Sequence, residues 1–232
     1  IIIMDTLKQI DISYIKTHKY KIIGVILVLV LLGGFIYYKF IRKDYTSLFK
    51  EAILLNNNYS KFVSHLYLPE SDDGRRFTYT FWIKFRNIPE NAGVLKTIFT
   101  EPKNIMNRNN SPKITYNIYS NILIFTVQYK NDDALVNYNL EVEDLPIQRW
   151  THIAYVLDNR NINVFIDGKL HKSGFIPSVP FLFNKNLNIG EIGETENFNG
   201  YLSDGRYYNK ALNYDKIESI SNEKNLLTLD SK

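Results

Sequence analysis

The chain has no cysteine among its 232 residues, and this absence excludes several kinds of chemistry at once. Disulfide bonds, thiolate metal ligands and cysteine nucleophiles all require a residue that the chain lacks. Histidine is scarce too, and its positions show no spacing typical of metal ligands or of a catalytic triad. The four histidines are His18, His65, His152 and His171. For His152, which falls inside an expected central strand, we expect a packed and hydrogen-bonded role.

Most of the chain also lacks an excess of positive charge. Residues 1–50 hold eight Lys and Arg against three Asp and so carry +5, which leaves −1 for the rest of a chain of net charge +4. Nucleic-acid-binding domains carry a basic patch or stripe on the folded part. The sequence therefore predicts no nucleic-acid partner.

What the chain does have is one long uncharged run. Residues 22–38 contain no charged side chain and lie between Lys21 and Lys39. At about 1.5 Å of rise per residue, such a run covers most of a hydrocarbon core of roughly 30 Å. No small-residue cleavage site follows it, which disfavours a signal peptide. Basic residues flank both sides, so the orientation in the membrane stays open.

This run predicts a single-pass membrane protein. We expect a short polar and basic tail over residues 1–20, a transmembrane helix over 21–41 and a juxtamembrane connector over 42–60. Three isoleucines precede Met4, which makes Met4 a candidate natural start. The residues expected to anchor the chain in lipid are Ile22, Val25, Leu29, Leu32, Phe35, Tyr37 and Tyr38.

Residues 77–85 alternate between two kinds of side chain. One face holds Phe77, Tyr79, Phe81, Ile83 and Phe85, and the other holds Thr78, Thr80, Trp82 and Lys84. A period of two residues is typical of a strand that is buried on one face. Residues 158–161 then separate two β-rich runs, and Asp167-Gly168 supplies the positive φ angles that a two-residue hairpin turn needs.

Short apolar segments separated by Asn, Asp, Gly and Pro continue along the rest of the chain. We expect strands at residues 61–68, 77–85, 94–100, 114–119, 122–129, 135–142, 150–157, 162–166, 186–192 and 200–208. Near the end, Asn213 is expected to cap a short helix with Ile217 and Ile220 as its apolar stripe. The sequence thus predicts an all-β, two-sheet antiparallel jelly-roll sandwich over residues 61–232, preceded by a single transmembrane α-helix.

Five segments in a fixed order carry a resemblance to a known family. They are Phe77 to Trp82, Trp150-Thr-His-Ile-Ala154, Val164-Phe-Ile-Asp-Gly-Lys169, Leu187-Asn-Ile-Gly190, and Phe198-Asn-Gly200 leading into Leu202 to Leu212. In this order and spacing, the chain resembles the laminin-G-like branch of the concanavalin A-like lectin and glucanase superfamily. The resemblance implies a two-sheet jelly roll and does not by itself imply a ligand.

The glucanases of that superfamily present carboxylates on one strand in the pattern Glu-x-Asp-x-x-Glu. Two acidic stretches, residues 141–144 and 191–196, come nearest to this pattern, and neither reproduces it. A retaining glycosidase needs two carboxyl groups roughly 5 Å apart. We therefore expect a non-enzymatic protein, with glycoside hydrolysis as the least favoured alternative.

The resemblance also implies a candidate ligand site, because laminin-G-like members often hold a divalent ion at a rim of loops. The acidic and amide residues of the expected loops are Asp72, Asp73, Asp132, Asp133, Asp158 and Asn161. The same residue types form turns for purely local reasons. We predict no cofactor and keep Ca²⁺ as the alternative. Trp82 and Trp150 are expected to pack in the fold rather than to stack on a sugar.

Together these patterns predict a membrane protein that displays a lectin-like domain as a structural or recognition component. Its expected partners are a lipid membrane and neighbouring proteins. Heavy use of Ile, Asn, Lys and Tyr is typical of AT-rich genomes. With the anchor, it favours a protein that links the internal membrane of a large DNA virus particle to its capsid shell. The alternative is a glycan-binding lectin or adhesion module on a cell or virion surface.

Overall fold

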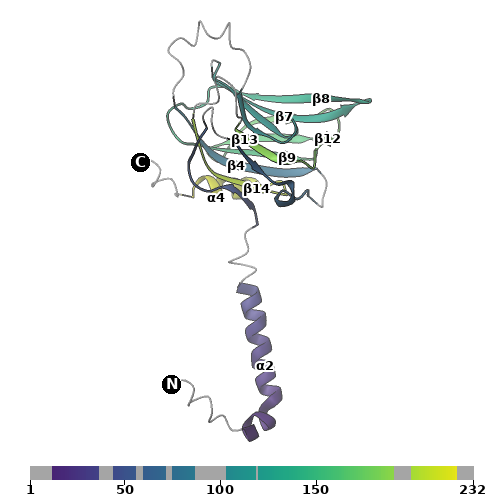
Figure 1. The fold of residues 1–232 in the computed structure, drawn as a ribbon, viewed down its shortest axis with the longest axis vertical. Helices are drawn as coiled ribbons and strands as arrows, with labels where there is room; N and C mark the ends of the chain where they lie inside the picture. Colours follow the sequence, from purple (N-terminus) through teal and green to yellow (C-terminus); the bar gives the residue numbers. More distant parts are fainter. Residues whose placement is uncertain are drawn as a thin grey trace. The chain divides into compact units, whose positions relative to one another are not determined.

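The computed structural model describes residues 12–36, 44–55, 60–71, 75–86, 103–118, 120–190 and 200–223. The chain divides into two units, Ile1–Asp44 and Tyr45–Lys232. The first contains a long helix and the second contains the β-sandwich (Figure 1). The strand predicted at residues 94–100 lies outside the described residues.

Helix α2 (Ile12–Ile36) occupies the first unit. Its segment His18–Phe35 is long and apolar enough to cross a membrane, a property that signal sequences share. Aliphatic side chains cover the helix surface and are exposed, among them Leu29 and Leu32. The helix begins well before residue 21, where the transmembrane span was predicted to start, and the predicted anchor residues Tyr37 and Tyr38 lie outside the described residues.

The second unit is a sandwich of two antiparallel sheets, each with seven strands among the described residues, so the predicted all-β jelly roll is confirmed. The first sheet has the order β1-β14-β4-β9-β10-β11, and β2 also pairs with β14. Its strands are β1 (Thr46–Phe49), β2 (Ile53–Leu55), β4 (Arg76–Phe85), β9 (Thr151–Asp158), β10 (Asn161–Ile166), β11 (Lys169–Phe175) and β14 (Gly200–Tyr208).

The second sheet has the order β12-β7-β6-β5-β13-β3, and β8 pairs with β7. Its strands are β3 (Ser60–Val63), β5 (Lys103–Asn107), β6 (Lys113–Asn117), β7 (Ile122–Asn131), β8 (Ala134–Val142), β12 (Pro180–Phe181) and β13 (Leu187–Gly190). A short 3-10 helix, η2 (His65–Tyr67), follows β3 in place of the second half of the strand predicted at 61–68.

The connector predicted over residues 42–60 is too long. Strands β1 and β2 fall inside it, and both pair with β14, where Thr46 lies opposite Tyr207 and Leu54 lies opposite Tyr201. These strands are short, and their partner lies near the other end of the chain, so local periodicity does not reveal them. The folded domain therefore begins at about Tyr45.

Strand β4 explains why two sheets pack together. The face predicted to be apolar lies in the main core, with Phe81 and Ile83 fully buried. Phe77 and Tyr155 meet edge to face with ring centroids 5.3 Å apart. Burying one such side chain contributes about 1.5–3 kcal/mol. The alternation read from residues 77–85 is therefore confirmed as the inward face of a central strand.

The outer face of the same sheet is also covered. Helix α4 (Tyr214–Ser221) lays Ile217 and Ile220 against Ala154, Val156 and Phe165, which form a second, smaller core. The side chain of Asn213 accepts a hydrogen bond from the backbone N–H of Lys216, so the predicted helix cap is confirmed. This second layer explains why strand β9 is apolar on both faces.

Candidate recognition surface

The β9–β10 turn carries two of the predicted rim residues. Asp158 ends β9 and Asn161 begins β10, and Asn159 between them adopts a positive φ of 55°. The carboxylate of Asp158 accepts a hydrogen bond from Arg76 Nε at 2.7 Å, which ties the turn to the start of β4. Asn161 is exposed. Asp158 therefore has a structural partner, whereas Asn161 is available for contact with a ligand.

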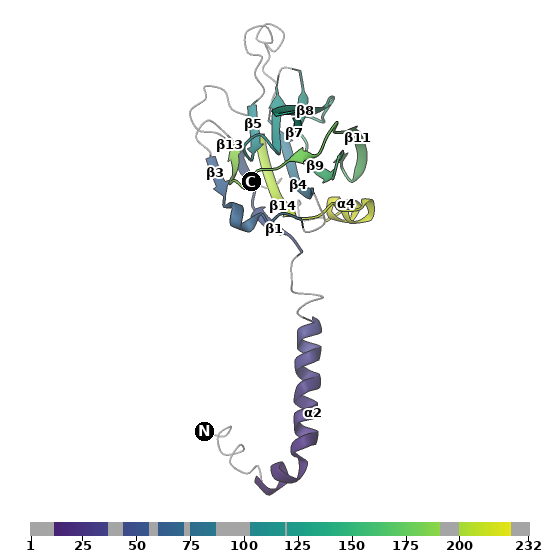
Figure 2. The same ribbon diagram turned by 90° about the vertical axis from the view of Figure 1, so that its right-hand side faces the viewer.

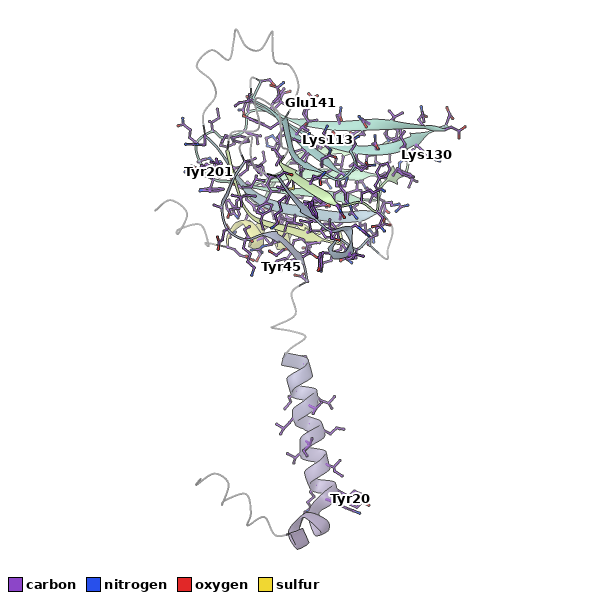
Figure 3. The ribbon with its side chains drawn as sticks, viewed as in Figure 1. Tyr20, Tyr45, Lys113, Lys130, Glu141 and Tyr201 are labelled. Carbon is purple, nitrogen blue, oxygen red and sulfur yellow. The ribbon has the colours of Figure 1, made fainter. Side chains whose placement is uncertain are left out.

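Asp132 and Asp133 form the tip of the β7–β8 hairpin. They lie between the paired residues Asn131 and Ala134, both are exposed, and Asp132 has a φ of 53°. Within the described residues, neither carboxylate has a hydrogen-bond or ion-pair partner. Lys130 beside this tip and Glu141 near the end of β8 lie at opposite ends of the hairpin (Figure 3). The tip is thus a free acidic pair at one end of the domain.

The two turns lie toward the same end of the sandwich. Arg160 in the β9–β10 turn donates hydrogen bonds to the backbone carbonyls of Ile176 (2.8 Å) and Pro177. A few residues further on, Pro180 of β12 lies opposite Tyr129, close to the β7–β8 tip. We name the β7–β8 tip and the β9–β10 turn together the loop end.

The described residues of the loop end do not include a cluster of acidic or histidine side chains. Among the described residues, no group of three or more His, Asp or Glu side chains is placed to hold a metal ion. Asp72 and Asp73, the other predicted rim residues, lie outside those residues. They precede Arg75, whose carbonyl accepts a hydrogen bond from Asn159 N–H at 2.9 Å. Arg75, directly before β4, therefore lies at the loop end.

The interior of the sandwich offers little room for a ligand. The gap lined by Tyr79, Met106, Pro112, Ile114 and Leu187 is apolar and too small to admit one. This gap is therefore not a candidate ligand site.

Sequence reasoning missed a buried polar cluster on the outer face of the first sheet. Arg206 is almost fully buried and pairs with Asp204 at 2.5 Å and Glu223 at 2.6 Å. These acceptors raise the pKa of Arg206 although burial acts to lower it. His152 and Trp82 lie nearby with ring centroids 5.1 Å apart. The cluster depends on the register of β14, β4 and β9, which no sequence pattern displays.

His152 differs from the hydrogen-bonded role expected for it. Its side chain is 1% exposed, and neither ring nitrogen has a hydrogen-bond partner. Its backbone N–H donates to Asp167 Oδ1 at 2.8 Å, so Asp167 holds the strand and not the ring. Burial lowers the pKa of His152 to about 4 and outweighs the opposing effect of Asp167. The imidazole is therefore neutral at physiological pH.

The cluster does not have the geometry of a catalytic centre. Ser203 and His152 lie on either side of Trp82 in the strand register, so about two strand spacings, roughly 10 Å, separate them. The hydroxyl of Ser203 points to the carbonyl of Lys50 instead. A nucleophile and its base must lie within hydrogen-bond reach. The acidic stretch at residues 141–144 is exposed on and after β8, and the one at 191–196 lies outside the described residues.

Trp82 has the packing role that the sequence predicts, since it is 9% exposed. Trp150 is half-buried and lies near Tyr201, with ring centroids 6.3 Å apart.

A family profile described as the concanavalin A-like lectin/glucanases superfamily, of laminin G type, matches residues 57–218. The chain belongs to this superfamily. The resemblance carried by the five sequence segments is thereby confirmed. No curated protein matches the chain in sequence.

Several solved structures share the fold of this superfamily member at low sequence identity. The binding domain of botulinum neurotoxin serotype G is 20% identical, with a TM-score of 0.56, over 76% of this chain and 46% of that one. The binding domain of Paraclostridial Mosquitocidal Protein 1 is 17% identical, with a TM-score of 0.56, over 78% and 46%. The binding domain of botulinum neurotoxin serotype D is 14% identical, with a TM-score of 0.56, over 73% of this chain and 41% of that one. The chain thus spans less than half the length of each structure, and each of these structures is named as a binding domain.

Proposed function

We propose that this protein is a non-enzymatic, single-pass membrane protein that presents its lectin-like domain as a recognition module. The observation that carries the proposal is the loop end, where Asp132, Asp133 and Asn161 are exposed and have no structural partner among the described residues. Such side chains supply the hydrogen-bond acceptors and donors that recognise hydroxyl-rich ligands. The first ligand class to test is therefore a glycan.

The lack of catalytic geometry supports the non-enzymatic part of the proposal. The buried cluster around His152 separates its serine from its histidine, and the proteins of similar fold are named as binding domains. Helix α2 supports the membrane anchor by its length and its exposed apolar surface.

A glycan array tests the recognition role directly. The full chain in lipid nanodiscs is probed alongside Asp132→Ala and Asn161→Ala, with Asp215→Ala on α4 as an exposed control outside the loop end. We expect binding to one glycan class that both loop-end variants weaken at least tenfold, which is about 1.4 kcal/mol, while the control keeps it. Equal binding by all four proteins would contradict a loop-end site. No binding by any of them would contradict a glycan ligand.

A second candidate function is architectural. Leu170, Phe175 and Val179 are exposed on and just after β11, an edge strand of the first sheet. Exposed edges and apolar side chains favour contact with another protein. In this role the protein would tie a membrane to a surrounding protein shell, such as the capsid of a virus with an internal membrane. The test is the native assembly, in which this edge would bury at least about 1,000 Å² against a shell protein.

A further inference from the structure

Three large apolar side chains gather in one short segment at the far edge of the second sheet. Phe62 of β3 is 70% exposed, and Leu66 and Tyr67 of η2 are 78% and 66% exposed. We name these three residues the β3–η2 patch. The domain's other large exposed apolar side chains lie on β8, α4 or β11 and the loop after it, as far as the described residues show. Strands β3 and β11 lie on opposite sides of the domain (Figure 2).

The turn that carries the patch is held rigidly. Leu68, directly after Tyr67, is 1% exposed, and its carbonyl accepts a hydrogen bond from the buried Arg108 at 3.2 Å. The next carbonyl, that of Pro69, accepts a hydrogen bond from Tyr207 Oη at 2.6 Å. At the start of the turn, His65 N–H donates to Asn186 Oδ1 at 3.0 Å. Because both ends of η2 are fixed, Leu66 and Tyr67 are presented outward by the fold.

The patch lies beside the point where the chain enters the domain. Thr46 Oγ1 of β1 donates to the carbonyl of Tyr67 at 2.7 Å, and Lys61 Nζ donates to the carbonyl of Leu48 at 3.1 Å. The first hydrogen bond joins η2 to β1, and the second joins β3 to β1. Tyr67 and the neighbour of Phe62 are thus tied to the first strand of the sandwich.

Chain length then limits how far the start of the domain at Tyr45 can be from the end of α2. Between Ile36 and Tyr45 the backbone spans at most about 30 Å even when fully extended. If the transmembrane span reaches residue 41, as its apolar composition predicts, the limit falls to roughly 14 Å. If α2 anchors the domain, the surface around β1 is the part of the domain that can most easily contact the bilayer.

We infer that the β3–η2 patch docks on the surface of the bilayer that α2 spans, with its occupant the headgroup and upper acyl region of the lipid. This inference rests on the proposed membrane anchor. Phe and Leu bury apolar area in this region, and Tyr is favoured where one end of the ring is apolar and the other is wet. Docking at this second point would fix the orientation of the domain on the membrane.

The absence of cysteine makes a sharp test available. Single cysteines replace Phe62, Leu66, Phe175 or Leu29 in the full chain, which is spin-labelled and reconstituted in phosphatidylcholine vesicles with a minor fraction of anionic lipid. Phe175, 58% exposed on β11, is the matched control, and Leu29 in α2 reports on the anchor. Collision rates with oxygen, which enriches in lipid, and with a water-soluble nickel complex are measured at each position.

The inference predicts an oxygen-to-nickel ratio at residues 62 and 66 several-fold above that at residue 175, and a higher ratio still at residue 29. If residue 29 is in lipid while 62 and 66 match 175, the anchor stands and the docking is wrong. If residue 29 is open to nickel, the anchor fails and the docking fails with it. Spin–spin broadening between copies at residue 62 would place a second copy on the patch and would also overturn the inference. Because all four side chains are exposed, we expect the substitutions to preserve the fold, and circular dichroism checks it.

Discussion

At the scale of single residues, the least expected feature is a buried histidine without a hydrogen bond. His152 lies under Trp82 with both ring nitrogens unpaired, beside Thr80 and Thr151, whose hydroxyls are also unpaired. Leaving such groups without partners costs about 1–3 kcal/mol each in a buried site. The cost is tolerated because the surrounding strands are fixed by Asp167 and by the ion pairs of Arg206.

The pKa of His152 predicts an acid-dependent loss of stability. Its folded value of about 4 lies below the unfolded value of 6.5, so between these values the unfolded chain binds more protons. The contribution of His152 to the free energy of unfolding is fully present above about pH 6.5. Below that pH it falls by up to about 1.4 kcal/mol per pH unit, and the fall stops below about pH 4. His152→Leu removes this dependence. Denaturant titrations of both proteins at pH 7 and pH 5 measure it, and equal losses on acidification would contradict the prediction.

At the scale of elements, the β10–β11 turn and helix α4 depend on each other. Asp167 and Gly168 both have positive φ angles, 48° and 79°, as the turn prediction required. Gly168 also lies directly beneath α4, where an added Cβ would come within 2.4 Å of Ser221 Oγ and 3.2 Å of Glu218 Cα. The glycine thus satisfies the turn and leaves room for the helix.

Gly168→Ala is expected to destabilise the fold by about 2–3 kcal/mol, from backbone strain together with the clash against α4. Adding Ser221→Ala removes the closest clashing atom and should restore part of the loss, while the strain and the Glu218 contact remain. Thermal unfolding of the single and double variants measures both effects. A Gly168→Ala protein within about 0.5 kcal/mol of the parent would show that α4 is not held against this turn.

How much of this the sequence predicts depends on how local the signal is. Strand β4 was predicted from its own alternation, and the helix cap from Asn213 alone. Strand β11 was missed because it is exposed on both faces and shows no period. Turn composition found the residues of the loop end, but the Asp158–Arg76 pair follows from strand register, as does the cluster around His152. Local rules identify elements, and register decides which side chains meet.

At the scale of the whole molecule, two separately folded units are joined by a short stretch of chain. The sandwich closes without any metal centre within its described residues. Among the described rim residues, Asp158 pairs with Arg76, while Asp132 and Asp133 lie at the β7–β8 turn without an ion-pair partner.

We therefore expect chelation to leave the protein's thermal stability unchanged. A calcium ion bound to the native state would contribute about 2.7 kcal/mol at a hundredfold excess over its Kd, and EDTA would remove that contribution. Melting of the full chain in detergent is followed with EDTA, with calcium and with magnesium. A lower melting temperature in EDTA that calcium alone reverses would reveal a site completed by residues such as Asp72 and Asp73.

The pairing of β1 with β14 sets the order in which the molecule can assemble. Thr46 of β1 lies opposite Tyr207 of β14, and β4 also pairs with β14 along one edge. Strands β1 and β4 therefore lack this partner until β14, near the C-terminus, has left the ribosome. At about 5–20 residues per second, that wait lasts on the order of 10–30 s. During synthesis, the segment of α2 emerges long before the sandwich can close. A chain that stops before residue 200 would carry unpaired edges on β1, β2 and β4, and we expect it to aggregate.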